Sequence, residues 1–264
     1  MPTAHATPVV CLHSSASSGR QWRRLVVDGG EAWQWHTPDL FGHGNRPDWP
    51  ELMPSQLAVE ANGVLSGLPF SPEQGFHLVG HSYGGAVALQ IAMQQPQRVL
   101  SLTLYEPVAF GVLPALGPDE PAWEEISVVA TTLGAALDRS DDFGAARGFC
   151  AYWHGRDVWP ELDVTQQLRV ADAMPTVRRH FEALFAAQWS DEMLDRVRMP
   201  VHLICGSATR ASARSVVLSL SERLPRARLN WLEGADHMAP VTAAARVNEL
   251  VLDSLGTMRK VAAA

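Results

Sequence analysis

A serine at position 82 lies inside a short glycine-rich stretch, GHSYG (80–84), which fits the pattern G-x-S-x-G. An apolar run (76–80, FHLVG) precedes the serine, and an apolar, Ala-rich segment follows it. Flanking glycines suit a turn so tight that side chains would clash, and such a turn exposes the serine hydroxyl. A hydroxyl presented in this way can act as a nucleophile once a base accepts its proton. A glycine-rich turn with an incidental serine is the alternative, and the strand-like and helix-like flanks favour the nucleophile.

The elements that must position this serine follow an alternating pattern along the chain. Short apolar runs alternate with longer helical patterns, which is typical of βαβ units and a parallel sheet. Several runs are almost continuously apolar, as expected when helices cover both faces of a sheet. We therefore predict an α/β fold with a mostly parallel sheet of about six strands and helices on both faces. The expected strands are 8–13, 34–38, 76–80, 100–105, 201–205 and 228–232, and the expected helices include 19–28, 55–67, 84–95, 212–224 and 241–255.

Residues 107–190 differ from the rest of the chain. They hold six prolines, no convincing strand pattern and only short helical patterns. We predict that this segment is a helical cap inserted into a core formed by 1–106 and 191–264. Most of its aromatic residues are expected to form the cap's own core: Trp123, Trp153, Trp159, Trp189, Phe110, Phe143, Phe149, Phe181 and Phe185.

Composition and charge limit the partners and the compartment. The chain of 264 residues is 47% hydrophobic with a formal net charge of −7, which argues against nucleic acid and anionic membranes as partners. No apolar run approaches the length of a membrane span, and the N-terminus does not resemble a signal peptide. Cys11, Cys150 and Cys205 are expected to be free thiols in a reducing compartment. We expect a cytoplasmic monomer or homodimer that acts on a small molecule.

The sequence also lacks the patterns of common cofactor sites. The three dispersed cysteines and the ten histidines show no metal-ligand spacing, and no G-x-G-x-x-G follows a strand-like run. We expect neither a metal nor another cofactor.

Two further stretches, together with the serine turn, give the chain a resemblance to the α/β-hydrolase family over almost its whole length. VVCLHSSASSGRQW (9–22) is similar to the family's loop after the first core strand, and PDLFGHGNRP (38–47) is similar to its Asp-x-x-Gly-His-Gly turn. The resemblance implies an α/β-hydrolase fold with Ser82 as nucleophile. It also implies that Asp39, Gly42, His43 and Gly44 shape a turn beside the cleft, a catalytic role for His43 being the weaker interpretation.

Two backbone N–H groups are candidates for an oxyanion hole. The N–H of Tyr83 begins the helix after the nucleophile and can donate toward a developing oxyanion. By the family's pattern, the N–H of Ser15 is the second donor. The loop here reads His13-Ser14-Ser15, in which serine replaces the usual glycine at the middle position.

His237 is the expected base. NWLEGADHMAP (230–240) is similar to the family's last strand followed by its histidine loop, and only His237 combines an end-of-strand position with the order serine then histidine. Imidazole suits the role because its unperturbed pKa lies near neutrality. It accepts the serine proton and later returns it to the leaving group. His154 and His180 are candidates for lining the cap.

The acid of the triad is not where the family usually carries it. That position follows the strand at 201–205, but the chain there reads CGSATRASARS (205–215), and no carboxylate lies between Met199 and Glu222. Glu106 ends the neighbouring strand, and some α/β-hydrolases place their acid on this strand. We therefore predict Glu106 as the acid. The alternatives are a cleft-edge role for Glu106, Asp236 as the acid, or a Ser–His dyad in which water or Thr209 orients the histidine.

The predicted reaction is hydrolysis through an acyl-enzyme on Ser82. Aromatic and methionine side chains in and near the cap suggest an apolar pocket, which favours a small or medium carboxylic ester, thioester or lactone. The candidate substrate-binding residues are His13, Ser14, Tyr105, Tyr152, Trp153 and Met238. Other chemistry remains open in the same fold: carbon–carbon bond hydrolysis, or a cofactor-free perhydrolase. A ligand-binding receptor without turnover and a partner-binding protein are the alternatives outside catalysis.

Overall fold

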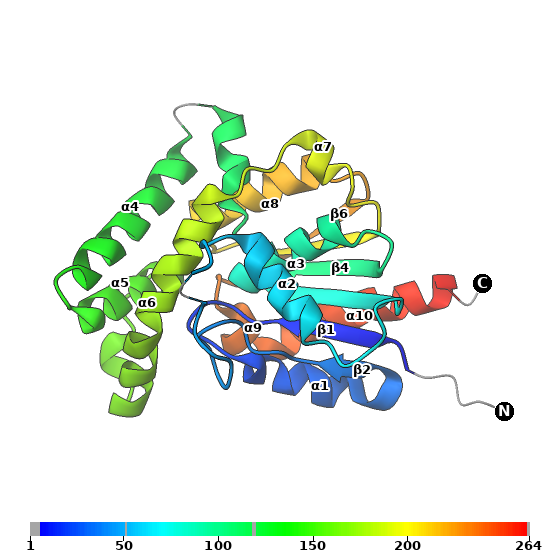
Figure 1. The fold of residues 1–264 in the computed structure, drawn as a ribbon, viewed down its shortest axis with the longest axis horizontal. Helices are drawn as coiled ribbons and strands as arrows, with labels where there is room; N and C mark the ends of the chain where they lie inside the picture. The colour runs from blue at the N-terminus through cyan, green and yellow to red at the C-terminus, as the bar shows by residue number, and fades with distance from the viewer. Residues whose placement is uncertain (1–5, 51, 118–119, 263–264) are drawn as a thin grey trace.

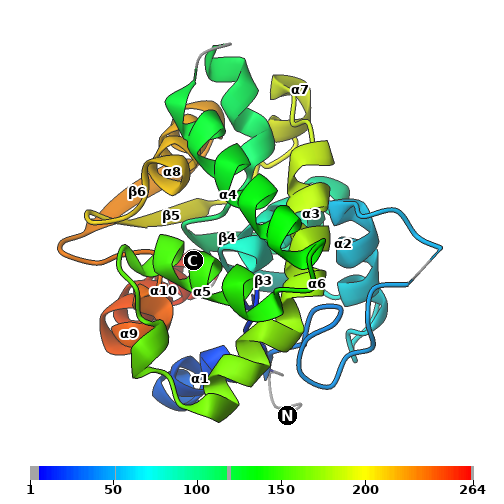
Figure 2. The same ribbon diagram turned by 90° about the vertical axis from the view of Figure 1, so that its left-hand side faces the viewer.

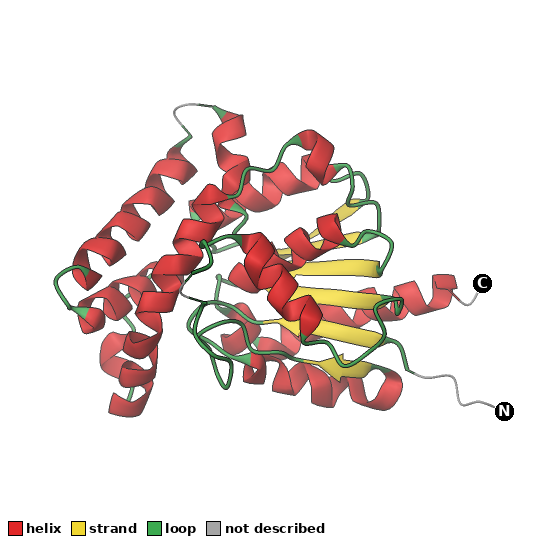
Figure 3. Ribbon diagram, in the orientation of Figure 1, coloured by secondary structure: helices red, strands yellow, loops and turns green. Residues whose placement is uncertain are grey.

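Six parallel strands form a single sheet at the centre of the molecule (Figures 1 and 3). The computed structural model describes residues 6–50, 52–117 and 120–262. The strands lie in the order β2-β1-β3-β4-β5-β6, and every neighbouring pair is parallel. Their bounds are β1 Pro8–Leu12, β2 Gln34–His36, β3 Phe76–His81, β4 Val99–Tyr105, β5 Val201–Gly206 and β6 Ala227–Leu232. The predicted α/β class is confirmed, and each predicted strand is present within two residues of its expected ends.

Helices cover both faces of this sheet, as the apolar strands require. Alternate residues of one strand enter different clusters: Val10 and Leu12 pack in the larger core, and Val9 and Cys11 pack in the smaller one. The larger core includes α2 (Leu57–Ser66), α3 (Tyr83–Gln94) and α8 (Ala211–Arg223). The smaller core includes α1 (Arg23–Gly29) and α10 (Ala244–Ala262).

Two of the predicted helices are divided into shorter pieces. The 3₁₀ helices η1 (Gly19–Trp22) and η2 (Gly30–Ala32) flank α1. The pattern at 241–255 predicts one helix, but α9 (Ala239–Thr242) ends before α10 begins at Ala244. Pro240 lies in the first turn of α9, where its missing N–H costs no hydrogen bond.

The segment between β4 and β5 is helical. It holds η3 (Phe110–Leu116), α4 (Pro121–Leu137), α5 (Asp142–His154), η4 (Trp159–Glu161), α6 (Val164–Ala186) and α7 (Asp191–Leu194). Helices α4, α5 and α6 lie beyond one end of the sheet and face the viewer in Figure 2. These helices are longer than the sequence predicts. Helix α6, for example, runs for 23 residues and includes Pro175, and a proline usually indicates the end of a helix. The cap boundaries at 107 and 190 stay a prediction.

Three further observations concern membrane spans, metal ligands and thiols. Within the described ranges, no helix is long and apolar enough to cross a membrane. The same residues contain no cluster of three or more His, Cys, Asp or Glu side chains that could hold a metal ion. All three cysteines are free, and Cys11 and Cys205 are buried in strands.

Candidate active site

The turn at Ser82 has the close approach that its glycines predict. Ser82 joins β3 to α3 with backbone angles φ 56° and ψ −123°, a strained combination for a residue with a side chain. A Cβ on Gly80 would lie 2.7 Å from the carbonyl oxygen of Gly84, and a Cβ on Gly84 would lie 2.4 Å from the carbonyl oxygen of His13. Larger residues therefore do not fit at either glycine. The strain is held by the Ser82 N–H, which donates to the carbonyl of Tyr105 on the neighbouring strand (3.1 Å).

The structure brings His237 to the nucleophile from 155 positions away in the chain. Its Nε2 lies 2.9 Å from Ser82 Oγ, and both side chains are almost fully buried. His237 lies in the loop between β6 and α9. This geometry allows Nε2 to accept the serine proton.

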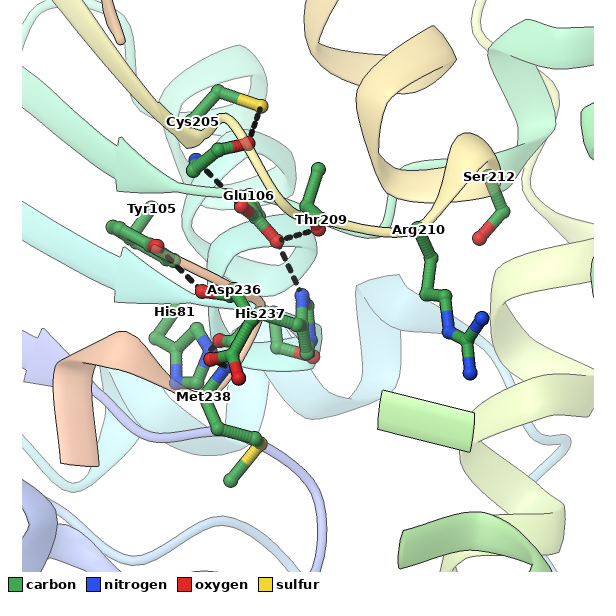
Figure 4. Close-up of polar contacts among 12 residues, drawn as sticks. His81, Tyr105, Glu106, Cys205, Thr209, Arg210, Ser212, Asp236, His237 and Met238 are labelled. Atoms are coloured by element: carbon green, nitrogen blue, oxygen red, sulfur yellow. Dashed lines mark hydrogen bonds and ion pairs between the residues drawn. The ribbon is translucent and has the colours of Figure 1, made fainter. Parts of the chain in front are cut away.

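Glu106 completes the chain of hydrogen bonds. Its Oε2 lies 2.7 Å from His237 Nδ1, and the residue is completely buried. Oε2 also accepts a hydrogen bond from Thr209 Oγ1 (2.6 Å), and Oε1 accepts one from the Gly206 N–H (2.8 Å). Figure 4 shows the carboxyl group between Thr209 and His237. A buried carboxylate requires such partners, and here every partner fixes its direction toward the imidazole.

The segment after β5, where an acid was not found, supports Glu106 instead. Glu106 has a positive φ of 42°, and its N–H donates to the carbonyl of Ile204 on β5 (3.1 Å). Thr209, in the position where the family usually carries an aspartate, contributes only a hydroxyl to the Glu106 carboxylate. The rival Asp236 is directed elsewhere, because its Oδ1 accepts the N–H of Met238 (2.9 Å).

A second set of contacts holds His237, and sequence reasoning missed these contacts. His81 Nε2–H donates to the carbonyl of His237 (2.9 Å), and its Nδ1 accepts from Gln21 Nε2 (3.1 Å). Gln21 Oε1 in turn accepts both the N–H and the hydroxyl of Ser14 (3.1 Å each). Burial holds the pKa of His81 well below its ordinary value, so the neutral ring links the first loop to the base. His81 had no signal in the sequence beyond its place in G-x-S-x-G.

The backbone N–H groups of Tyr83 and Ser15 are the two predicted oxyanion donors. Tyr83 is the first residue of α3, where the N–H has no partner within the helix. In the described part of the chain, neither this N–H nor that of Ser15 donates to another residue. Ser15 and Ser82 line the same two cavities. Both N–H groups are thus available to a bound oxygen.

Comparison with known proteins identifies the family and the fold. The sequence profile of the "Alpha/beta hydrolase family" matches residues 9–250. The chain belongs to this family. The fold agrees as well: an alpha/beta hydrolase from a Medee basin deep-sea metagenome library has a TM-score of 0.79 at 16% identity, over 97% of this chain and 91% of that one.

Relatives with names were also found by sequence similarity. The pimeloyl-[acyl-carrier protein] methyl ester esterase of Aeromonas hydrophila is 28% identical over 87% of this chain and 87% of its own length. The dihydrolipoyllysine-residue acetyltransferase component of the acetoin cleaving system of Cupriavidus necator is 36% identical over 106 residues. That match covers 40% of this chain and only 28% of the component.

Two neutral histidines hold the loop between β1 and η1 by hydrogen bonds to the backbone. His13 Nε2 accepts the N–H of Leu40 (2.9 Å), and His43 Nε2 accepts the N–H of Ala16 (2.9 Å). In each ring Nδ1–H donates to a backbone carbonyl. Burial lowers the pKa of His13 to about 3 and lowers that of His43, so neither ring is charged near neutral pH. The contacts of His43 agree with the expected role in shaping the turn.

The rest of the 38–47 turn is built as the family pattern implies. Asp39 accepts the N–H of Gly19 (2.8 Å) through Oδ1 and the N–H of Asn45 (2.9 Å) through Oδ2. Gly42 and Gly44 have positive φ angles, and a Cβ on Gly44 would lie 2.1 Å from the Asp39 carboxylate.

Three of the predicted substrate contacts, Ser14, Trp153 and Met238, reach the cavity beside Ser82. This cavity, of about 200 Å³, is lined mainly by apolar side chains and includes Ser14, Trp153, Met238 and His237. The Trp153 ring is stacked on the His237 ring (centroids 3.8 Å apart, 24° between planes). Ser15 lines the same cavity, and so does His154.

The other three candidates do not lie among the described residues that line this cavity. The Tyr105 hydroxyl donates to the carbonyl of Asp236 (2.6 Å), and the Tyr152 hydroxyl is bonded to Ser212 Oγ (2.6 Å). His13 is fully buried in the first loop. We correct the expectation for these three: their contacts place them in the framework of the site, because their polar atoms are bonded to protein partners rather than turned to the cavity.

Glu60 is a buried acid whose side chain lies near that of Tyr83. Its side chain is completely buried on α2, and its Oε1 accepts the N–H of Phe41 (3.1 Å). Burial raises the pKa of Glu60 to about 7, against the opposing effects of the Phe41 N–H and the charge of Arg46. The raised pKa means that the folded protein retains a proton that the unfolded chain loses near pH 4.5.

The Glu60→Gln variant is therefore expected to change how stability depends on pH. Between the unfolded pKa of 4.5 and the folded pKa of about 7, wild-type stability falls as pH rises, by up to about 3 kcal/mol. Glutamine keeps the acceptor for Phe41 and removes the titration. Urea unfolding of both proteins at about pH 5 and about pH 8 measures the difference. If the difference in unfolding free energy between wild type and variant is the same at both pH values, the raised pKa of Glu60 is contradicted.

Proposed function

We propose that this protein is a serine hydrolase that cleaves a small or medium, largely apolar carboxylic ester, thioester or lactone. The observation that carries the proposal is the continuous set of hydrogen bonds from Ser82 Oγ through His237 to Glu106. The methyl ester esterase among its relatives supports ester chemistry.

The geometry supports a two-step reaction. His237 Nε2 accepts the Ser82 proton as Oγ attacks the carbonyl carbon, and Glu106 stabilises the imidazolium that forms. The N–H groups of Tyr83 and Ser15 donate to the oxyanion. His237 then gives the proton to the leaving group, an acyl-enzyme remains on Ser82, and a water activated by His237 releases the acid.

The cavities favour a short acyl group and a larger apolar leaving group. A cavity of about 10 Å³ lies beside Ser82 and Ser15, closed by Phe110, Phe181 and Leu184, and His237 is not among its lining residues. A volume of this size admits about one small group. The leaving group must lie beside His237, which protonates it, and His237 lines the cavity of about 200 Å³. A polar cavity of about 640 Å³ adjoins the cavity of about 200 Å³ at Ala16 and Ser17, but neither Ser82 nor His237 is among its lining residues.

Labelling with a fluorophosphonate and hydrolysis of p-nitrophenyl esters test the proposal together. Stoichiometric labelling that is lost in Ser82→Ala, with ester hydrolysis that falls as the acyl chain lengthens beyond a few carbons, is the expected result. Folded protein that binds apolar ligands but is not labelled would favour the receptor interpretation. Labelling without ester hydrolysis would direct the search to carbon–carbon or perhydrolase chemistry at the same serine.

A further inference from the structure

One cap residue contacts both residues of the oxyanion hole. His180, on α6, is 1% exposed, and its Nδ1 lies 2.8 Å from the hydroxyl oxygen of Ser15. The same ring is stacked on the Tyr83 ring, with centroids 3.5 Å apart and 7° between planes. It lines the small cavity together with Ser15 and Ser82. The contact joins positions 165 residues apart in the sequence.

The loop that carries Ser15 is held from two sides. Ala16, the next residue, has a positive φ of 53°, and its N–H is held by His43. The ring of His43 lies stacked near that of His180 (centroids 5.1 Å apart). The Ser15 side chain is therefore fixed through His180, and its backbone through the following peptide.

The environment of His180 indicates which atom carries the proton. In the described part of the chain, its buried Nε2 has no hydrogen-bond partner. Burial lowers the pKa of His180 well below its ordinary value, so the ring is neutral and carries one N–H. A buried N–H without a partner is rarer than a buried acceptor without one. The proton therefore belongs on Nδ1, which donates to Ser15 Oγ.

This tautomer leaves the proton of the Ser15 hydroxyl unused. Oγ accepts from His180, and no other residue in the described part of the chain receives a hydrogen bond from it. Ser15 lines both cavities that include Ser82, so an acceptor bound in the site can receive this proton. The tetrahedral oxygen near the Ser15 N–H is such an acceptor.

We propose that the Ser15 hydroxyl is a third oxyanion donor and that His180 is the positioning residue that orients it. The inference rests on the proposed serine hydrolase function. The Ser15 hydroxyl would touch the reacting oxygen, whereas His180 acts only through Ser15. A cap residue then takes part in oxyanion stabilisation without contacting the substrate's carbonyl.

Four variants test this arrangement: Ser15→Ala, Ser15→Thr, His180→Phe and the double variant Ser15→Ala/His180→Phe. Phenylalanine keeps the ring stack on Tyr83 but removes the hydrogen bond. His202→Phe is the matched control, because His202 is also a buried histidine with a side-chain hydrogen bond, to Asn230 (2.9 Å), and it lines neither cavity. The readouts are kcat and KM for p-nitrophenyl acetate, the rate of fluorophosphonate labelling, and the melting temperature.

We expect Ser15→Ala to lower kcat and the labelling rate about tenfold or more, toward the 10²- to 10³-fold cost of an oxyanion donor, with KM little changed. His180→Phe should lower kcat similarly, the double variant should be no worse than the Ser15→Ala variant, and Ser15→Thr should retain most of the activity. The control should lose stability and keep its kcat.

Two outcomes overturn the proposal, and they are distinguishable. Equal labelling rates in wild type and Ser15→Ala, or fully additive losses in the double variant, remove the third donor and leave the serine hydrolase function standing. Wild-type protein that is folded but is never labelled at Ser82 removes the hydrolase function and this inference with it.

Discussion

The His237→Gln variant is expected to lose about 10⁶-fold in kcat for ester hydrolysis, with its fold intact. Glutamine approximates the size of the ring but cannot accept the Ser82 proton and return it, and no other base lies within hydrogen-bond distance of Ser82 Oγ among the described residues. Steady-state kinetics with p-nitrophenyl acetate and circular dichroism measure the two quantities.

The same experiment separates catalysis from packing. His202→Gln changes another buried histidine and should leave kcat unchanged within error. Combining His237→Gln with Ser82→Ala should cost no more than either change alone, because the two side chains act as a unit. Additive losses would show that His237 works independently of Ser82.

Glu106→Gln is expected to lower kcat by about 10³- to 10⁴-fold without unfolding the protein. The amide can still accept the Gly206 N–H, but its NH₂ group would face His237 Nδ1 in place of a carboxylate oxygen. The imidazole would then carry its proton on Nε2, toward Ser82, and could no longer act as the base. The pH profile of kcat and the melting temperature complete the measurement.

Two further variants decide between Glu106 and its rivals. Asp236→Asn retains the acceptor for the Met238 N–H, so it should change kcat only slightly. Thr209→Val removes one hydrogen bond to the Glu106 carboxylate and leaves the bond to His237 intact, so its loss should be much smaller. A loss below about tenfold in Glu106→Gln, together with a large loss in either of the others, would reject Glu106 as the acid.

The sheet and the turn at Ser82 were predictable because their signals are local. Apolar runs bounded by glycine and proline mark the strands, and the glycines at 80 and 84 are required by backbone contacts that the structure shows. Family membership followed from the same stretches. Glu106 was predicted from the missing carboxylate after 201–205, from its place at the end of the neighbouring strand and from the family resemblance, but nothing in the sequence predicts its positive φ.

The remaining parts of the site depend on tertiary contacts. The bond from His180 to Ser15 and the bonds through His81 join distant segments, and each histidine alone resembles any buried histidine. Tyr105 and Tyr152 were misplaced because an aromatic residue near a strand end or in a cap suggests a pocket wall. Their hydroxyl groups find protein partners instead, as buried hydroxyls must.

Because the carboxylate follows β4, the stretch after β5 makes other contacts. Arg210 Nε donates to the carbonyl of Tyr152 on α5 (2.5 Å), and the N–H of Ser212 donates to Glu125 on α4 (3.0 Å). The segment that usually carries the acid therefore anchors helices α4 and α5, and the Gly206 N–H and the Thr209 hydroxyl connect it to Glu106. Substitutions at Arg210 or Ser212 would therefore alter contacts with α4 and α5, while the hydrogen bond from Glu106 to His237 would remain.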